Sequence, residues 1–131
     1  DGYDLETLYD DVGLKAQVEQ QDLAGAKETL QQAISSSSDV QLKHVARTRL
    51  IRVFLASNEY EQGLQLVADV DQSSLGGFEG VYEELKGDLY VAMARIGEAR
   101  TAYQAALKAG ESSPLLQFKL DDLTLADSDQ G

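Results

Sequence analysis

Few side chains in this sequence could support acid–base, nucleophilic or metal chemistry. His44 is the single histidine, and the 131 residues contain no cysteine. The chain therefore offers no thiol nucleophile, disulfide or zinc–thiolate site, and sites that need several imidazole ligands are not expected. The residue types alone leave a Ser–His–Asp triad open, but no nucleophile elbow accompanies any serine. We expect no metal and no cofactor.

Two carboxylate pairs and one glycine pair are the remaining candidates for chemistry. Glu83–Glu84 and Asp121–Asp122 are sequence neighbours, and neighbours on a helix point about 100° apart, so they do not converge on a substrate. We interpret both pairs as solvated helix faces. Gly76–Gly77 lacks the other glycines and the Lys-Ser/Thr of a phosphate-binding loop. The sequence thus predicts no catalytic and no cofactor-binding residue, and a protein that is not an enzyme.

The charge balance bears on the class of partner. Eleven Lys and Arg residues face 23 Asp and Glu residues, which gives a net charge of −12. Nucleic acids and anionic membrane surfaces would repel such a chain, so neither is an expected ligand. No apolar run approaches the roughly 20 residues of a membrane helix. Because the sequence opens at Asp1–Gly2 without a methionine, we expect an excised soluble piece of a longer protein.

One short stretch is basic, and it has two interpretations. Its cationic and histidine side chains are Lys43, His44, Arg47, Arg49 and Arg52. They could pair with the acidic excess, since Asp39 precedes Lys43 by four residues. Alternatively, they could form a basic stripe on a groove wall that receives an acidic or carboxylate-bearing segment of a partner.

The elements that position these residues are all predicted to be helices. Apolar residues recur every three or four positions, as at Leu85, Leu89 and Ala92, and strict alternation is nearly absent. Serine, glycine and proline clusters at 35–39, 73–77 and 109–114 mark the breaks. The predicted helices cover residues 4–20, 22–35, 40–57, 60–71, 78–94, 96–109 and 114–124.

Three of these segments align as an internal repeat. The small residues Ala26, Gly63 and Ala99 take equivalent places, at intervals of 37 (26 to 63) and 36 (63 to 99) residues. Such a period, with two helices per unit, indicates tetratricopeptide-like packing; another helical-hairpin array, such as a HEAT-like pair, is the alternative. In the third unit Gly87 would allow the two helices to approach closely, with Tyr103 at the expected spacing.

The predicted fold is therefore all-α, with about three tetratricopeptide-like helical hairpins in one domain, 1–131. The units span 4–35, 40–71 and 78–109, wind into a short right-handed solenoid and end in a capping helix at 114–124. In such an array the first helix of each pair lines a concave groove. The candidate partner-binding residues on those helices are Val45, Thr48, Arg52 and Leu55, and Val81, Glu84, Asp88 and Val91.

Residues 41–107 resemble a known family, the ancillary SecYEG translocon subunits, which are YfgM-like tetratricopeptide-repeat proteins. The resemblance is carried by Gln41–Lys43, Ala46–Val53, Tyr60–Leu64, Leu85–Asp88 and Gly97–Tyr103. The chain departs from the family at Ala94, where the family usually has a turn glycine, and in the more acidic stretch before residue 20.

The resemblance implies a bacterial inner-membrane protein with an N-terminal anchor and a periplasmic repeat domain. Its partners would be Sec translocon subunits and a membrane-anchored, prolyl-isomerase-like periplasmic chaperone, and it would help to hand emerging chains to the periplasm. The alternative is a structural or assembly tetratricopeptide protein of another cell-envelope complex, whose repeats self-associate.

Overall fold

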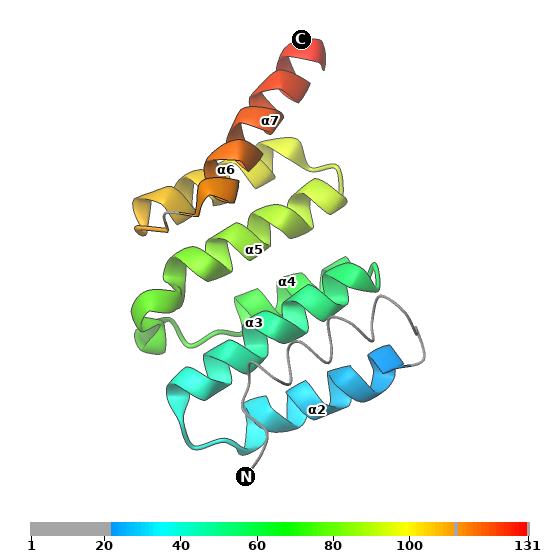
Figure 1. The fold of residues 1–131 in the computed structure, drawn as a ribbon, viewed down its shortest axis with the longest axis vertical. Helices are drawn as coiled ribbons and strands as arrows, with labels where there is room; N and C mark the ends of the chain where they lie inside the picture. The colour runs from blue at the N-terminus through cyan, green and yellow to red at the C-terminus, as the bar shows by residue number, and fades with distance from the viewer. Residues whose placement is uncertain (1–21, 112, 131) are drawn as a thin grey trace. The chain divides into compact units, whose positions relative to one another are not determined.

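The computed structural model describes residues 22–111 and 113–130, and its regular structure there is entirely helical (Figure 1). This confirms the all-α prediction, and no strand occurs in the described part. The predicted helix at 4–20 lies outside the described residues. The helices are α2 (Asp22–Ser36), α3 (Val40–Ala56), α4 (Tyr60–Ala68), α5 (Glu79–Ala92), α6 (Ile96–Lys108) and α7 (Pro114–Gln130), and two short 3₁₀ helices, η1 (Gln72–Ser74) and η2 (Gly76–Phe78), connect α4 to α5.

Two helix ends differ from the prediction by more than two residues. Helix α4 stops at Ala68 rather than at residue 71, and Asp71 instead begins η1 by accepting hydrogen bonds from Ser73 N (3.0 Å) and Ser73 Oγ (2.7 Å). Short polar side chains of this kind compete with helical hydrogen bonding. Helix α7 continues to Gln130 rather than ending at 124, since no glycine or proline interrupts it.

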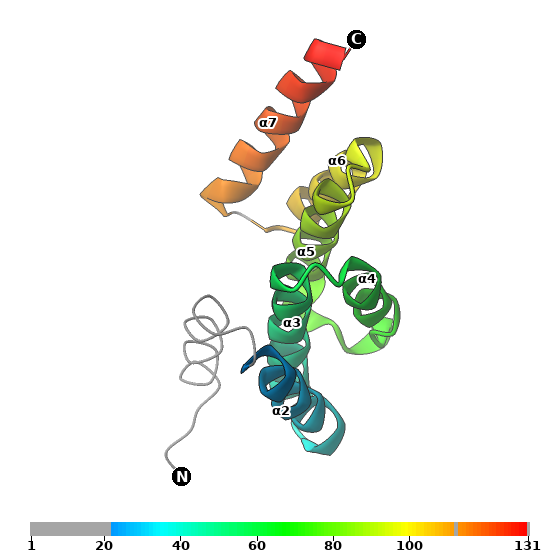
Figure 2. The ribbon, with the colours of Figure 1, turned by 90° about the vertical axis from the view of Figure 1, so that its right-hand side faces the viewer.

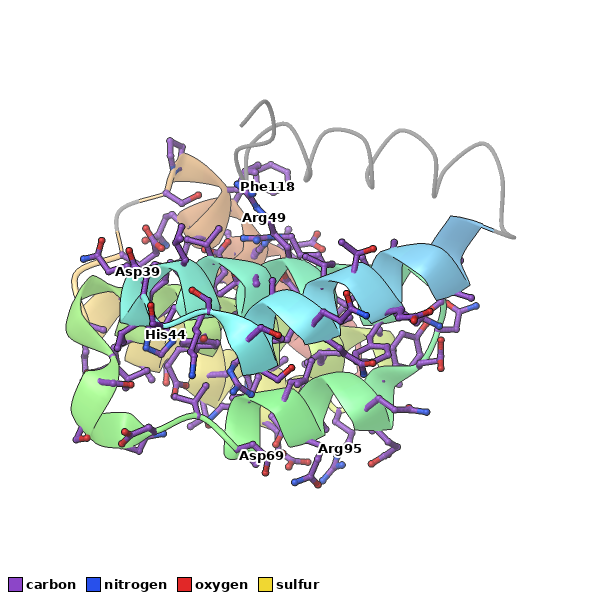
Figure 3. All side chains as sticks on the ribbon, turned by 90° about the horizontal axis from the view of Figure 1, so that it is seen from below. Asp39, His44, Arg49, Asp69, Arg95 and Phe118 are labelled. Atoms are coloured by element: carbon purple, nitrogen blue, oxygen red, sulfur yellow. The ribbon has the colours of Figure 1, made fainter. Side chains whose placement is uncertain are left out.

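The chain divides into two compact units, Asp1–Val70 and Asp71–Gly131. In the first unit α2, α3 and α4 pack around a core of buried residues from α2 and α3. The core residues are Leu30, Ala46, Leu50, Val53 and Phe54, and Leu66 of α4 packs against them. The turn before α3 is closed by Asp39 (Figure 3), whose carboxylate accepts hydrogen bonds from the backbone N–H groups of Gln41 (2.9 Å) and Leu42 (3.2 Å).

In the second unit α5 and α6 form a helical hairpin, and α7 packs on α6 (Figure 2). A Cβ atom at Gly87 of α5 would lie 2.4 Å from the Tyr103 ring of α6, which confirms the predicted close approach at this glycine. The core of this unit joins α6 to α7 through buried side chains. They are Ala99, Tyr103, Ala106, Leu116, Leu120 and Leu123.

The same turn closes the α3–α4 and α5–α6 hairpins, which is direct evidence for a repeat. Asn58 and Ala94 both adopt left-handed backbone, with φ of 62° and 61°. In each turn the next residue donates a 2.8 Å backbone hydrogen bond, from Glu59 N to the Phe54 carbonyl and from Arg95 N to the Tyr90 carbonyl. The two turn residues are 36 positions apart, which is the predicted period. The division into three units of one domain, and the right-handed winding, stay predictions.

Candidate partner-binding surfaces

The four partner-binding residues predicted in repeat 40–71 lie on one face of α3, as their spacing of three and four residues requires. Val45, Arg52 and Leu55 are partly exposed. Thr48 is buried, with only 4% of its surface exposed, and its hydroxyl donates to the Val45 carbonyl at 2.9 Å. The accessible part of this face is therefore a guanidinium flanked by two aliphatic side chains.

The four residues predicted in repeat 78–109 share a face of α5, and two of them already accept hydrogen bonds from other helices. Val81 is partly exposed and Val91 is exposed. Glu84 and Asp88 both accept hydrogen bonds from Lys119 of α7, whose Nζ lies 2.8 Å from Glu84 Oε2 and 3.1 Å from Asp88 Oδ2. The hydroxyl of Tyr103 in α6 also donates a hydrogen bond to Asp88 Oδ1, at 2.6 Å. The cluster Glu84–Asp88–Tyr103–Lys119 thus joins all three helices of the second unit.

The charge states of this cluster suit a structural role. Burial raises the pKa of the Tyr103 phenol, and the hydrogen bond to Asp88 raises it further. Burial alone would lower the pKa of Lys119, but its hydrogen bonds to Glu84 and Asp88 outweigh burial and raise that pKa. Near neutral pH Lys119 is therefore cationic and Tyr103 protonated. The hydrogen bonds of the cluster join α5, α6 and α7, so the cluster acts as a clamp between these helices.

The adjacent carboxylates Glu83 and Glu84 point to different partners, as predicted for neighbours on a helix. The interpretation of this pair as a solvated face was wrong, because the two side chains are only 24% and 16% exposed and each pairs with a lysine. Glu83 accepts a 3.2 Å hydrogen bond from Lys86 on its own helix, whereas Glu84 reaches Lys119 on α7. Within the described residues, no group of three or more His, Cys, Asp or Glu side chains could hold a metal ion. No described helix is both long and apolar enough to cross a membrane.

The basic stretch of α3 does not form a single stripe. At about 100° per residue, Arg52 lies about 140° around the helix from Arg47. Arg47 forms a hydrogen bond inside the unit 1–70, in which its Nη1 donates to the Leu66 carbonyl of α4 at 3.1 Å. His44 is buried (Figure 3). Of this stretch, Arg52 is the member on the predicted partner-binding face.

A contact in the first unit ties α2 to the start of α4. Lys27 of α2 donates to the Glu59 carboxylate, and its ammonium lies 5.5 Å from the centre of the Phe54 ring. Ser57 donates to the same carboxylate at 2.7 Å. The hydrogen bonds from Lys27 and Ser57 lower the pKa of Glu59, although partial burial opposes them.

The second unit has an open groove of about 710 Å³ between α5 and α6, which we call the α5–α6 groove. Its apolar lining residues are Tyr90, Ile96, Ala102 and Ala105, and its charged lining residues are Glu83, Lys86, Arg95 and Glu98. The charges form pairs: Lys86 with Glu83, and Arg95 with Glu98 through two hydrogen bonds of 2.6 and 2.8 Å. Arg95 also stacks over Tyr90, with its guanidinium carbon 5.2 Å from the ring centre.

Neither Lys119 nor the α5–α6 groove was identified from the sequence. Lys119 is the single lysine of α7, and nothing local to it predicts a contact with residues 31 and 35 positions earlier. The groove residues lie on the parts of α5 and α6 that the contact between these two helices leaves uncovered. The apolar residues of α5 and α6 recur with the 3.6-residue period of a helix. Those that do not pack at the Gly87–Tyr103 contact include the ones that line the groove, and the sequence could have identified them in this way.

Comparison with known proteins agrees with this architecture. A family model described as a tetratricopeptide repeat-like domain matches residues 12–125. No curated protein and no solved structure matches the chain.

Proposed function

This chain belongs to the tetratricopeptide repeat-like family, and on that premise we propose that it is a scaffold that binds a partner protein through the α5–α6 groove. Repeat domains of this type are typically non-catalytic binding scaffolds. The observation that carries the proposal is the groove itself. Its size suits a segment of polypeptide, and its lining combines apolar side chains with a small number of placed charges.

The internal pairing of the groove charges favours an amphipathic occupant. Lys86–Glu83 and Arg95–Glu98 are each neutral as pairs, so the groove exerts little net attraction on an ion. The apolar side chains of a partner segment would cover Ile96 and Ala105, while its polar side chains would exchange hydrogen bonds with the charged pairs and fix its register.

A pair of matched substitutions tests the groove. Ala105→Glu places a carboxylate in the groove, and glutamate is a good helix former, so α6 should still fold. Gln104→Glu adds the same charge at an exposed neighbouring position outside the groove. The full-length tagged protein would be purified from detergent-solubilised source membranes and its associated proteins identified by mass spectrometry. We expect Gln104→Glu to retain the partners and Ala105→Glu to lose them while its helical circular dichroism is kept. Equal recovery with both variants would contradict binding in the groove.

The predicted faces of α3 and α5 belong to the same proposal as secondary contacts. Val45, Arg52 and Leu55 present a cation between aliphatic side chains, and Val81 and Val91 flank the clamped carboxylates Glu84 and Asp88. Arg52→Glu should weaken binding of the recovered partner without unfolding the domain. Unchanged affinity with intact circular dichroism would remove Arg52 from the binding surface.

For the partner's identity, we propose a role beside the Sec translocon, on the periplasmic side of the bacterial inner membrane. The proposal is supported by the order and spacing of the runs Ala46–Val53, Leu85–Asp88 and Gly97–Tyr103, which resemble the ancillary translocon subunits. Recovery of translocon subunits or of a prolyl-isomerase-like chaperone in the purification above is the expected result. Recovery of an unrelated assembly would discard this assignment and leave the scaffold role standing.

The second candidate is a structural or assembly protein of another cell-envelope complex, in which the repeats bind one another. Sedimentation of the isolated domain distinguishes the two. A scaffold for a different protein should sediment as a monomer, whereas concentration-dependent self-association would favour the assembly role.

A further inference from the structure

Helix α7 carries large apolar side chains on two separate faces. On one face Leu116, Leu120 and Leu123 are buried against α6. The other face exposes Leu115, Phe118 and Leu125, which are 64%, 69% and 66% accessible. At about 100° per residue the centres of the two faces lie about 150° apart around the helix, so the exposed side chains take no part in the α6–α7 contact.

The exposed face is unusual for a helix that already buries one apolar face against its neighbour. An amphipathic surface helix typically carries charged and polar residues on the side opposite its buried face. Here the outer face carries two leucines and a phenylalanine within an arc of about 80°. Exposed apolar side chains gathered in this way mark a surface that a partner covers.

The charges around this face are negative. Asp122 lies within the arc, between Leu115 and Phe118 on the helical projection, and Asp121 lies next to Leu125 on its far edge. The cation of α7, Lys119, is turned toward α5 and clamped by Glu84 and Asp88. An occupant of the face therefore meets an apolar seam with carboxylates within and beside it.

We propose that the outer face of α7, formed by Leu115, Phe118, Asp121, Asp122 and Leu125, docks a basic amphipathic helix of a partner protein. The apolar residues of such a helix would pack on the seam, and its flanking Lys or Arg side chains would pair with the two aspartates. A second copy of this chain fits less well, since symmetric pairing would bring like carboxylates together. An anionic membrane surface would be repelled by the same charges.

This site is independent of the α5–α6 groove, because the two surfaces share no residue. The protein could therefore hold one partner segment in the groove and another on α7. Failure of either proposal would leave the other in place.

The test uses a fluorescein-labelled helical peptide built from Leu and Lys, and a counterpart of the same apolar pattern built from Leu and Glu. Fluorescence anisotropy would measure their binding to the whole chain. We expect the Leu–Lys peptide to bind and the Leu–Glu peptide not to bind. Phe118→Ser should weaken binding roughly tenfold or more, whereas Leu42→Ser, at an exposed leucine of α3, should leave it unchanged.

A second matched pair tests the charge. Asp122→Lys and Glu61→Lys change the net charge equally, but Glu61 lies on α4 in the other unit. Only Asp122→Lys should weaken binding. Ala105→Glu should have no effect, which separates this site from the α5–α6 groove.

Four results would overturn the proposal. Equal weakening by both members of either pair would show non-specific attraction to an acidic protein, and equal binding of the Leu–Glu peptide would remove the charge argument. Self-association of the free protein that Phe118→Ser abolishes would make a second copy the occupant. If the protein bound phosphatidylglycerol vesicles and Phe118→Ser abolished that binding, the occupant of this face would be a membrane surface.

Discussion

Ala94 occupies a backbone conformation that favours glycine, with φ of 61° at the α5–α6 turn. Replacing it with glycine should relieve the contact between Cβ and the backbone. We predict that Ala94→Gly raises the free energy of unfolding by about 1 kcal/mol, measured by urea denaturation. The matched control is Ala92→Gly at the end of α5, where helical backbone favours alanine and the free energy of unfolding should fall by up to about 1 kcal/mol. Changes of the same sign in both variants would contradict the assignment of strain to residue 94.

Gly87 is required by its distance from Tyr103 rather than by its backbone angles. A Cβ at this position would meet three atoms of the Tyr103 ring within 2.9 Å, and that ring is held by its hydrogen bond to Asp88. We expect Gly87→Ala to lower the free energy of unfolding by about 1–3 kcal/mol through overpacking. Gly97→Ala, on α6 with nothing within 4 Å of the added Cβ, should be neutral or stabilising by up to about 1 kcal/mol. Equal thermal unfolding midpoints for the two variants would show that the ring moves aside without cost.

Glu59 gives the first unit a pH-dependent contribution to stability. Its hydrogen bonds from Lys27 and Ser57 lower its pKa in the folded state below the ordinary value of 4.5. A group with a lowered folded pKa contributes stability above its unfolded pKa and loses it as pH falls through the folded pKa. The difference in unfolding free energy between wild type and Glu59→Gln should therefore be largest near neutral pH and shrink below about pH 4.5. A difference that stayed constant from pH 7 to pH 3 would show that the Glu59 carboxylate adds no stability through its charge.

At the scale of helices, α7 packs on its neighbours through one of its two apolar faces only. Leu116 is fully buried on α6, whereas its neighbour Leu115 is mostly exposed. We predict that Leu116→Ala lowers the free energy of unfolding by about 3 kcal/mol, and that Leu115→Ala changes it by less than about 0.5 kcal/mol. Chemical denaturation of both variants checks this. Similar losses would mean that α7 packs through both faces.

Most helices could be predicted from the sequence because local signals mark their ends. Asp39 caps the start of α3 and Pro114 begins α7, and both residues lie in the clusters 35–39 and 109–114 that predicted breaks between helices. The end of α4 was missed because Asp71 captures the backbone of Ser73, an interaction that apolar spacing does not report. The full length of α7 was missed because its last residues lack the apolar period.

The candidate sites were less predictable, since they depend on contacts between distant residues. Glu84 and Asp88 share one face of α5, as their spacing of four residues requires, but their hydrogen bonds to Lys119 depend on where α7 lies. The two apolar faces of α7 did leave a signal in the sequence. On a helical wheel, Leu115, Phe118 and Leu125 lie on the side opposite Leu116 and Leu120. A helix that packs through one face only needs a single apolar stripe, so the second stripe is a signal of a further contact.

At the scale of the molecule, the chain's acidity and its apolar surfaces favour the same kind of function. A net charge of −12 disfavours nucleic acids and anionic lipids, whereas the α5–α6 groove and the outer face of α7 both offer apolar area to another polypeptide. The shared turn at Asn58 and Ala94 shows how one local geometry, repeated after 36 residues, builds two hairpins from different sequences.

The central claim is that the α5–α6 groove binds a partner protein, and hydrogen–deuterium exchange tests it most directly. Exchange would be compared for the full chain alone and with the partner recovered by purification. We predict slower exchange on binding in peptides that cover residues 83–105, which hold the groove-lining side chains. Protection confined to other segments, with residues 83–105 unchanged, would contradict the claim.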